Sequence, residues 1–211
     1  MTDKRSQELL KLAKKIESLD YIEVSDIPNI NLYMDQLTTF MDETLASSKR
    51  RPEDKILTKT MINNYAKNHL LPPPDKKKYS KDHVILLIFI YYMKNVISIS
   101  DINTLLAPLK EEYFGGKGEI TMTEIYNEML SFFKKEESYQ YDLVKEQLAH
   151  SEKLFTDTDL SEEKVDTLRR LSFICALSFD VYLKKLMIET MIDEELESLK
   201  SESKDSKKGR K

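Results

Sequence analysis

Apolar residues recur every three or four positions along most of the chain, and strict alternation of apolar and polar residues is nearly absent. This spacing is typical of amphipathic helices rather than of strands. Only four glycines and six prolines interrupt the pattern, so we expect a mainly α fold. The helices are expected at residues 1–20, 32–45, 58–68, 80–96, 100–106, from 121 onward, and 161–199.

Capping residues indicate where several of these helices begin. A Ser or Thr side chain at the N-cap accepts a hydrogen bond from a free N–H group of the first turn. Thr121 and Glu124 have the spacing of a capping box, in which two side chains and two N–H groups pair reciprocally. Prolines 72–74 must end the third helix because proline has no N–H donor, and an extended arm is expected after them. Further N-caps are expected at Thr58, Ser80 and Ser100.

Two of the helices carry the apolar surface expected to form a core. The helix at 80–96 is apolar on nearly every side from Val84 to Met93, which indicates the centre of a core. The helix that begins near residue 121 is apolar on one face only. That face carries Ile125, Met129, Phe132 and Phe133.

The last helix carries an apolar stripe that is wider than the seam of a two-stranded coiled coil needs. Two uses of the stripe remain open: it covers other helices of the same chain, or it pairs with a second protomer in a homodimer. We expect the homodimer. The stripe consists of Leu168, Leu171, Cys175, Val181, Met187, Ile188, Met191 and Ile192.

Length and composition limit the class of protein. With 211 residues, of which 40% are hydrophobic and 33% charged, the chain can form one sizeable domain or two small ones. Its opening residues form an amphipathic pattern and not a signal peptide, so a cytoplasmic location is expected. The stretch 171–192 is apolar, but its Asp180, Lys184, Lys185 and Glu189 would be costly in hydrocarbon. We expect a buried helix there, and no membrane partner.

The chain shows no pattern that is typical of a catalytic or metal site. Its single cysteine, Cys175, excludes an internal disulfide, and the apolar residues around it predict a buried, inert thiol. The three histidines are scattered and have no companion cysteines, so no zinc site is expected. The run GGKGE lacks the spacing and the terminal Lys-Ser/Thr of a phosphate-binding loop. We therefore expect neither an enzyme nor a bound cofactor.

Charge is distributed unevenly along the chain. Residues 49–83 contain ten Lys and Arg but only four Asp and Glu, a local balance of +6, whereas the whole chain has a formal charge of −4. The remainder therefore sums to −10. A local basic region on an acidic background is typical of a surface that faces nucleic acid, although a solvated basic loop has the same composition.

Several sequence elements between residues 57 and 106 follow one another in a fixed order. They are Leu57-Thr58, Ile62, Tyr65, Leu70-Leu71-Pro72-Pro73, Tyr79-Ser80, the helix from His83 to Met93, Ser98-Ile99-Ser100-Asp101-Ile102, and Leu105-Leu106. In this order the chain resembles the N-terminal winged helix-turn-helix of MerR-type regulators, over about a quarter of its length. The resemblance implies a recognition helix before the prolines, a wing after them, and a core helix that begins at Ser80.

The chain departs from the MerR pattern at three positions. Asn63 and Asn64 stand where that family usually has an arginine and an aromatic residue, and His69 stands where it usually has glycine. The arginine that clamps a phosphate is therefore missing. Asparagine can bond an adenine edge in the major groove, and it is equally ordinary as an exposed helix residue.

The stretches NLYMDQLTTFMDE, TKTMINNYAKNHLLPPPDKKKYS and HVILLIFIYYMKNVISISDI resemble an uncharacterised bacterial family, domain of unknown function 1836. That resemblance brings no established activity. It implies that the helix at 32–45 is the first helix of the helix-turn-helix, with SSKRRPEDK as an enlarged turn. We expect an N-terminal helix and linker (1–30), a winged helix-turn-helix domain (31–110), a helical dimerisation or sensor region (111–199), and a disordered basic tail (200–211).

Two classes of function remain. The first is a dimeric bacterial transcription regulator that binds duplex DNA sequence-specifically, with an unidentified small-molecule effector as a further candidate partner. The second is a non-enzymatic protein-interaction module that keeps a winged-helix fold. In the first, the recognition helix enters the major groove and the wing lysines lie along phosphates. The residues expected to contact DNA are Thr58, Lys59, Thr60, Asn63, Asn64, Tyr65, Lys67, Lys76, Lys77, Lys78 and Tyr79.

Overall fold

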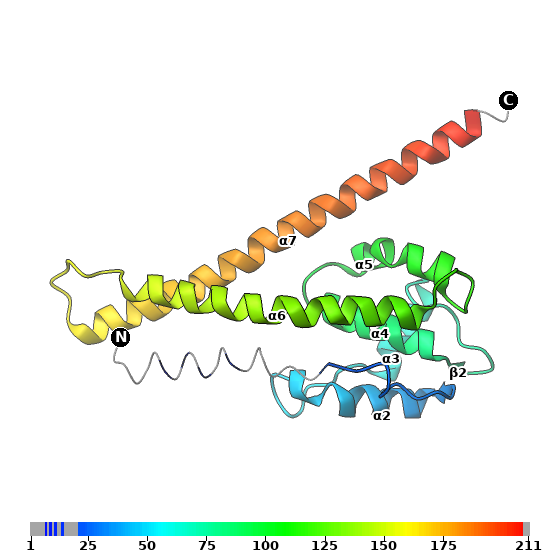
Figure 1. The fold of residues 1–211 in the computed structure, drawn as a ribbon, viewed down its shortest axis with the longest axis horizontal. Helices are drawn as coiled ribbons and strands as arrows, with labels where there is room; N and C mark the ends of the chain where they lie inside the picture. Colours follow the sequence, from blue (N-terminus) through cyan, green and yellow to red (C-terminus); the bar gives the residue numbers. More distant parts are fainter. Residues whose placement is uncertain (1–6, 8, 10, 12–13, 15–20, 209–211) are drawn as a thin grey trace. The chain divides into compact units, whose positions relative to one another are not determined.

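The computed structural model describes Gln7, Leu9, Lys11, Lys14 and residues 21–208, with side chains through residue 194 (Figure 1). Most of the helix predicted for residues 1–20 therefore lies outside the described residues, although Gln7, Leu9 and Lys11 are helical. The chain is mainly helical, as predicted, with one small sheet among the described residues. The elements are Leu32–Tyr33 (β1), Met34–Thr44 (α2), Ala46–Ser48 (η1), Lys59–Lys67 (α3), Lys78–Tyr79 (β2), Lys81–Met93 (α4), Ile99–Leu105 (α5), Leu109–Tyr113 (η2), Met122–Glu152 (α6) and Glu162–Lys208 (α7).

The chain divides into two compact units. The first unit comprises Asp20–Met129 and Lys185–Lys211, and it contains β1, β2 and α2 to α5. The second unit comprises Met1–Leu19 and Leu130–Lys184, and it contains most of α6 and the first half of α7. Within the described part of the chain, no helix is both long and apolar enough to cross a membrane.

The core of the first unit is built around α4. Every residue of α4 from Val84 to Ile90 is at most 1% exposed, which confirms that this helix is the centre of a core. At roughly 1.5–3 kcal/mol for each fully buried large apolar side chain, this one helix supplies a large share of the driving force for folding. From α6, the ring of Tyr126 packs edge-on against Phe89, and its hydroxyl donates to the Ile22 carbonyl at 2.6 Å.

A two-stranded antiparallel sheet lies beside α2 and α4. Leu32 of β1 pairs with Tyr79 of β2, and Tyr33 pairs with Lys78. Leu32 and Tyr79 are buried, whereas Tyr33 is exposed. A turn with left-handed Lys76 and Lys77 follows the prolines, so the extended arm predicted there is limited to the two residues of β2, which pair with β1.

Three of the predicted helix starts are confirmed. The Thr58 side chain accepts from the Met61 N–H, Ser80 forms a capping box with His83, and Thr121 forms one with Glu124.

The fourth start, predicted at Ser100, is wrong by two residues. Helix α5 begins after Ser98, because the carboxylate of Asp101 accepts from the Ser98 N–H at 3.3 Å while the Ser98 hydroxyl accepts from the Asp101 N–H at 3.1 Å. Ser100 then lies inside the first turn of the helix.

The apolar face predicted for α6 is also displaced. In its first three turns the buried residues are Met122, Tyr126 and Leu130, one every four positions, whereas Phe132 is exposed. The predicted face did not include Tyr126, whose hydroxyl donates to a buried carbonyl, so that the ring can enter the core.

Helix α7 differs from its prediction in length and burial. It begins at Glu162 and continues to Lys208, past the predicted end at residue 199 and into the tail predicted to be disordered. Lysine, frequent in this stretch, is a good helix former. The stretch 171–192 is not a buried helix, since Leu171 and Cys175 are both exposed. The helix packs through its opposite face, where Phe173 is buried.

His69 follows the C-terminal end of α3, at a position where the backbone is left-handed. This residue has a φ of +58°, its N–H donates to the Ala66 carbonyl, and the Leu70 N–H donates to the Tyr65 carbonyl. These two bonds define a Schellman motif, whose left-handed residue is usually glycine because a Cβ is strained there. The His69 carbonyl accepts from the Lys110 ammonium at 2.9 Å. The glycine of MerR-type regulators would therefore suit this backbone.

We expect His69→Gly to stabilise the chain by about 0.5–1 kcal/mol, since relief of the left-handed strain outweighs the larger chain entropy of glycine. Urea unfolding measures the change. His69→Ala is the matched control, because it removes the imidazole but keeps the Cβ and should bring no gain. Equal stability of the glycine variant and the unchanged chain would contradict the prediction.

Candidate nucleic-acid interface

Helix α3 has one buried and one exposed face. Ile62 and Tyr65, three positions apart, point into the first unit, and Tyr65 is only 7% exposed. On the opposite side, the exposed face of α3 consists of Lys59, Thr60, Asn63, Asn64 and Lys67. This face is polar and carries two lysines and no carboxylate.

Three of the predicted DNA contacts have side chains that are engaged within the unit. The rings of Tyr65 and Tyr79 are buried, and burial raises the pKa of both hydroxyls. The Thr58 hydroxyl oxygen accepts from the Met61 N–H as the N-cap of α3. The structure thus gives these three side chains packing and capping roles and leaves the others of the predicted set at or near the surface.

Lys59 is not a free cation. Its ammonium forms an ion pair with the carboxylate of Asp35, which lies in the first turn of α2. Both side chains are mostly exposed, so the pair is weak, but the carboxylate offsets the charge of Lys59 on the exposed face of α3. Sequence reasoning had no means of pairing these two residues, because they lie on different helices.

The lysines after the prolines form a tight turn, Asp75–Lys78, which we call the lysine turn. The Lys78 N–H donates to the Asp75 carbonyl at 2.8 Å. Its two central residues, Lys76 and Lys77, have φ values of +46° and +66°. Positive φ at both positions is the pattern of a type I′ turn, which strongly favours Asn-Gly. Lysine at both positions is costly, and both side chains are exposed.

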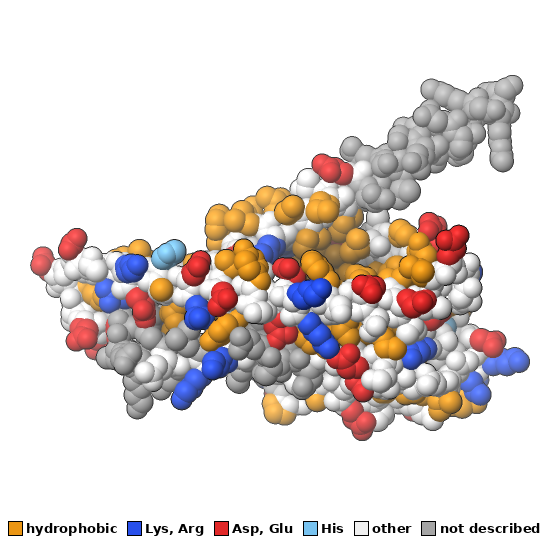
Figure 2. Space-filling model, in the orientation of Figure 1, with side chains coloured by type: hydrophobic (Ala, Val, Ile, Leu, Met, Phe, Trp, Pro, Cys, Tyr) orange, Lys and Arg blue, Asp and Glu red, His pale blue; other side chains and the backbone are white. Residues whose placement is uncertain are grey.

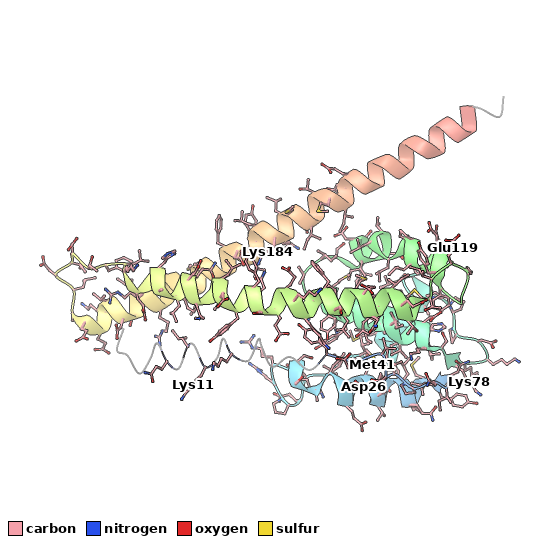
Figure 3. All side chains as sticks on the ribbon, viewed as in Figure 1. Lys11, Asp26, Met41, Lys78, Glu119 and Lys184 are labelled. Carbon is pink, nitrogen blue, oxygen red and sulfur yellow. The ribbon has the colours of Figure 1, made fainter. Side chains whose placement is uncertain are left out.

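Lys78 lies next to a residue that sequence reasoning missed. Its ammonium lies 5.1 Å from the centre of the Tyr33 ring, a cation–π contact, and Figure 3 labels Lys78 in β2. Tyr33 is 52% exposed. The only signal in the sequence was a tyrosine just before a helix, which gave no reason to place it beside the wing.

A groove of about 520 Å³ runs beside the first turn of α3 and the exposed side of α2. Its walls carry both signs of charge, from Asp42 and Glu43 on α2 and from Lys55 and Lys59. The ammonium of Lys49 donates to Asp42 at 2.8 Å, and this hydrogen bond lowers the pKa of that carboxyl. The basic surface is therefore concentrated on the lysine turn and the C-terminal half of α3.

His83 connects the lysine turn to the core. Its Nδ1 accepts from the Ser80 N–H at 3.0 Å, so Nε2 carries the proton and donates to the Pro72 carbonyl at 3.2 Å. The ring packs edge-on against Tyr79 and Phe114. Burial lowers the pKa of this imidazole, which favours the neutral form that the two hydrogen bonds require.

The model of the family described as Domain of unknown function (DUF1836) matches residues 22–129, slightly more than half of the chain. The chain belongs to this family. In this member of the family, the matched stretch lies within the first unit and includes α2, α3, the lysine turn and α4. No curated protein and no solved structure matches the chain. The resemblance of residues 57–106 to MerR-type regulators stays a prediction.

The side chains of this family member include no candidate metal centre among the described residues, where no three His, Cys, Asp or Glu side chains come together. The interface is thus a surface of lysines, amides and hydroxyls. Such groups bind by hydrogen bonds and charge, and they suit an extended anionic partner.

The pKa of His83 makes stability depend on pH. Because burial lowers this pKa in the folded chain, the unfolded chain, with a pKa of about 6.5, takes up a proton first as the pH falls. We therefore expect His83 to make its full contribution to the free energy of unfolding above about pH 7. This contribution should decline as the pH falls through about 6.5 toward the pKa of the folded chain. Urea unfolding between about pH 5 and pH 8 measures it.

His83→Gln is the matched control for this pH dependence. Glutamine at this position can complete the capping box with Ser80, and it does not titrate in this range. As the pH falls, the free energy of unfolding of this variant should therefore decrease less than that of the unchanged chain. Identical pH profiles for the two proteins would show that His83 does not contribute.

Proposed function

We propose that the first unit binds duplex DNA through α3 and the lysine turn, as a bacterial transcription regulator with a winged helix-turn-helix. The observation that carries the proposal is the lysine turn, where Lys76 and Lys77 occupy two left-handed positions that favour Asn-Gly. Backbone strain of this kind persists where it serves a function. Two exposed cations at the tip of a turn are suited to phosphates. Because a bacterial regulator acts on DNA in the cytoplasm, the proposal includes a cytoplasmic location.

In this mode of binding, α3 lies in the major groove and the lysine turn follows the backbone. Asn63 and Asn64 are exposed on α3 and can read base edges, while Thr60 and Lys67 flank them. Lys76, Lys77 and Lys78 lie along phosphates, with the exposed Tyr33 beside Lys78 as a further contact. If roughly four phosphates are contacted, log affinity falls with log salt at a slope of about −3.6 per protomer.

One observation favours a second function, a protein-interaction module without DNA binding. Asp35 pairs with Lys59, and Asp42 and Glu43 line the groove beside α3, so carboxylates border the surface that would approach DNA. Such carboxylates repel phosphates and would suit a basic protein partner. The two functions differ in how the chain responds when these charges are changed.

The first test replaces the central pair of the lysine turn by Lys76→Asn with Lys77→Gly. We expect the variant to be more stable by about 1 kcal/mol, because Asn-Gly suits the turn. We also expect it to bind duplex DNA more weakly, with a salt slope shallower by about 1.8 for two lost phosphate contacts. Urea unfolding and fluorescence anisotropy with a labelled duplex measure the two effects.

The charge-preserving control for this test is Lys76→Arg with Lys77→Arg, which should keep the affinity. A turn with a purely structural role would leave the salt slope of the Asn-Gly variant unchanged. Absence of duplex binding by the unchanged chain at low salt would remove the proposal and favour the protein-interaction module.

The second test changes Asp35→Asn. This substitution frees Lys59 and removes a negative charge from the edge of α3, so we expect tighter duplex binding and a salt slope steeper by about 0.9. Glu119→Gln is the control, since it removes the same charge outside α2, α3 and the lysine turn. Equal effects of the two substitutions would mean that only the net charge matters and that α3 does not face DNA.

A further inference from the structure

The exposed surface of α7 between residues 171 and 183 is almost entirely apolar. In this range every residue exposed as a whole is apolar, apart from Ser178 and the thiol Cys175, and the one charged residue, Asp180, is half-buried and pairs with Lys184. The exposed apolar side chains are Leu171, Ile174, Phe179, Val181, Tyr182 and Leu183. Together with Cys175 we call them the α7 apolar sector, and Figure 2 shows hydrophobic side chains gathered on this helix.

The polarity of α7 is the reverse of that of an ordinary surface helix. Two of its charged side chains make contacts within the second unit: Arg169 donates to the Leu154 carbonyl, and Lys184 donates to Gln140 and Asp180. The apolar side chains point away from these contacts, and the rings of Phe179 and Tyr182 stack on each other. An amphipathic helix normally turns its apolar face to a packed neighbour.

The exposed apolar area is large enough for a specific interface. Leu171 is 55%, Phe179 60% and Tyr182 56% exposed. With the other members of the sector, this amounts to roughly 700 Å² per chain, above the largest apolar patch of a typical monomer. Two copies of the sector would bury roughly 1,400 Å² in total, which is the size of a standard stable interface.

We propose that the α7 apolar sector is the interface of a homodimer and that its occupant is the same sector of a second copy of the chain. A symmetric interface brings a surface against itself, so any charge in it would meet its own sign. The sector has no charge to repel its copy and none with which a different partner could be selected. This inference does not rest on DNA binding. If the chain does bind DNA, a dimer would bind two half-sites of the duplex.

The test is sedimentation of the full chain at micromolar concentrations, with the unchanged chain expected to be a dimer. Phe179→Glu places a charge in the sector and should raise the dimer dissociation constant at least about 100-fold. Thr167→Glu is the matched control, because it adds the same charge at an exposed site before the sector and should leave the dimer intact.

Cys175 provides a second readout, since it is exposed in the single chain and is the one cysteine of the sequence. Its rate of alkylation by a maleimide should fall as the protein concentration rises and the dimer forms. A monomer, whether its thiol reacts quickly or is protected, would overturn the inference, and so would a dimer that Phe179→Glu does not weaken.

The outcomes for the two proposals are separate. A dimer that does not bind duplex DNA would remove the proposed function and keep the interface. A DNA-binding chain that stays monomeric would remove the interface and keep the proposed function.

Discussion

The neutral imidazole of His83 links the elements that form the candidate interface. His83 accepts from the Ser80 N–H and donates to the Pro72 carbonyl, and a ring with a single proton can do both only in the tautomer protonated at Nε2. Ser80 begins α4 and Pro72 follows α3, so one side chain links the end of the candidate recognition helix to the start of the core helix. Its edge-on contact with Tyr79 extends the link to β2. The position of α3 relative to the lysine turn therefore depends on a side chain that is itself buried.

Strain in the segment after α3 suggests what this surface is for. His69, Lys76 and Lys77 all have positive φ although none is glycine. At His69 the backbone is engaged in a Schellman motif and in a bond to Lys110, so the strain accompanies a structural role. At Lys76 and Lys77 the backbone closes the Asp75–Lys78 turn, but the side chains lie in solvent and make no contact that would require lysine. A turn that would be more stable as Asn-Gly but carries two lysines is consistent with selection for charge rather than for stability.

The two units use charge in opposite ways. In the first unit, lysines lie at the surface of α3 and the lysine turn, and nearby carboxylates such as Asp35 and Asp42 moderate them. In the second unit, Arg169 and Lys184 of α7 make contacts within the unit, and most apolar side chains between residues 171 and 183 are exposed. The first arrangement suits a polyanionic partner, and the second suits a partner that is as apolar as the helix itself.

The amino-acid sequence by itself determined the helical fold, three of the N-caps and the core position of α4. These features depend on neighbours within one turn, or on an apolar run that leaves no face for water. Local patterns also located the basic segment around the prolines. They did not show that Tyr65 and Tyr79 are buried, that Lys59 pairs with Asp35, or that Tyr33 lies beside Lys78.

Only the tertiary structure decided these points, because each depends on which helix or strand lies opposite. Spacing shows which residues share a face, but on a helix with two apolar faces, such as α7, it cannot show which face the chain itself covers. That choice left Cys175 exposed where its neighbours in sequence predicted burial. Packing between distant segments thus determines which side chains remain free to bind a partner.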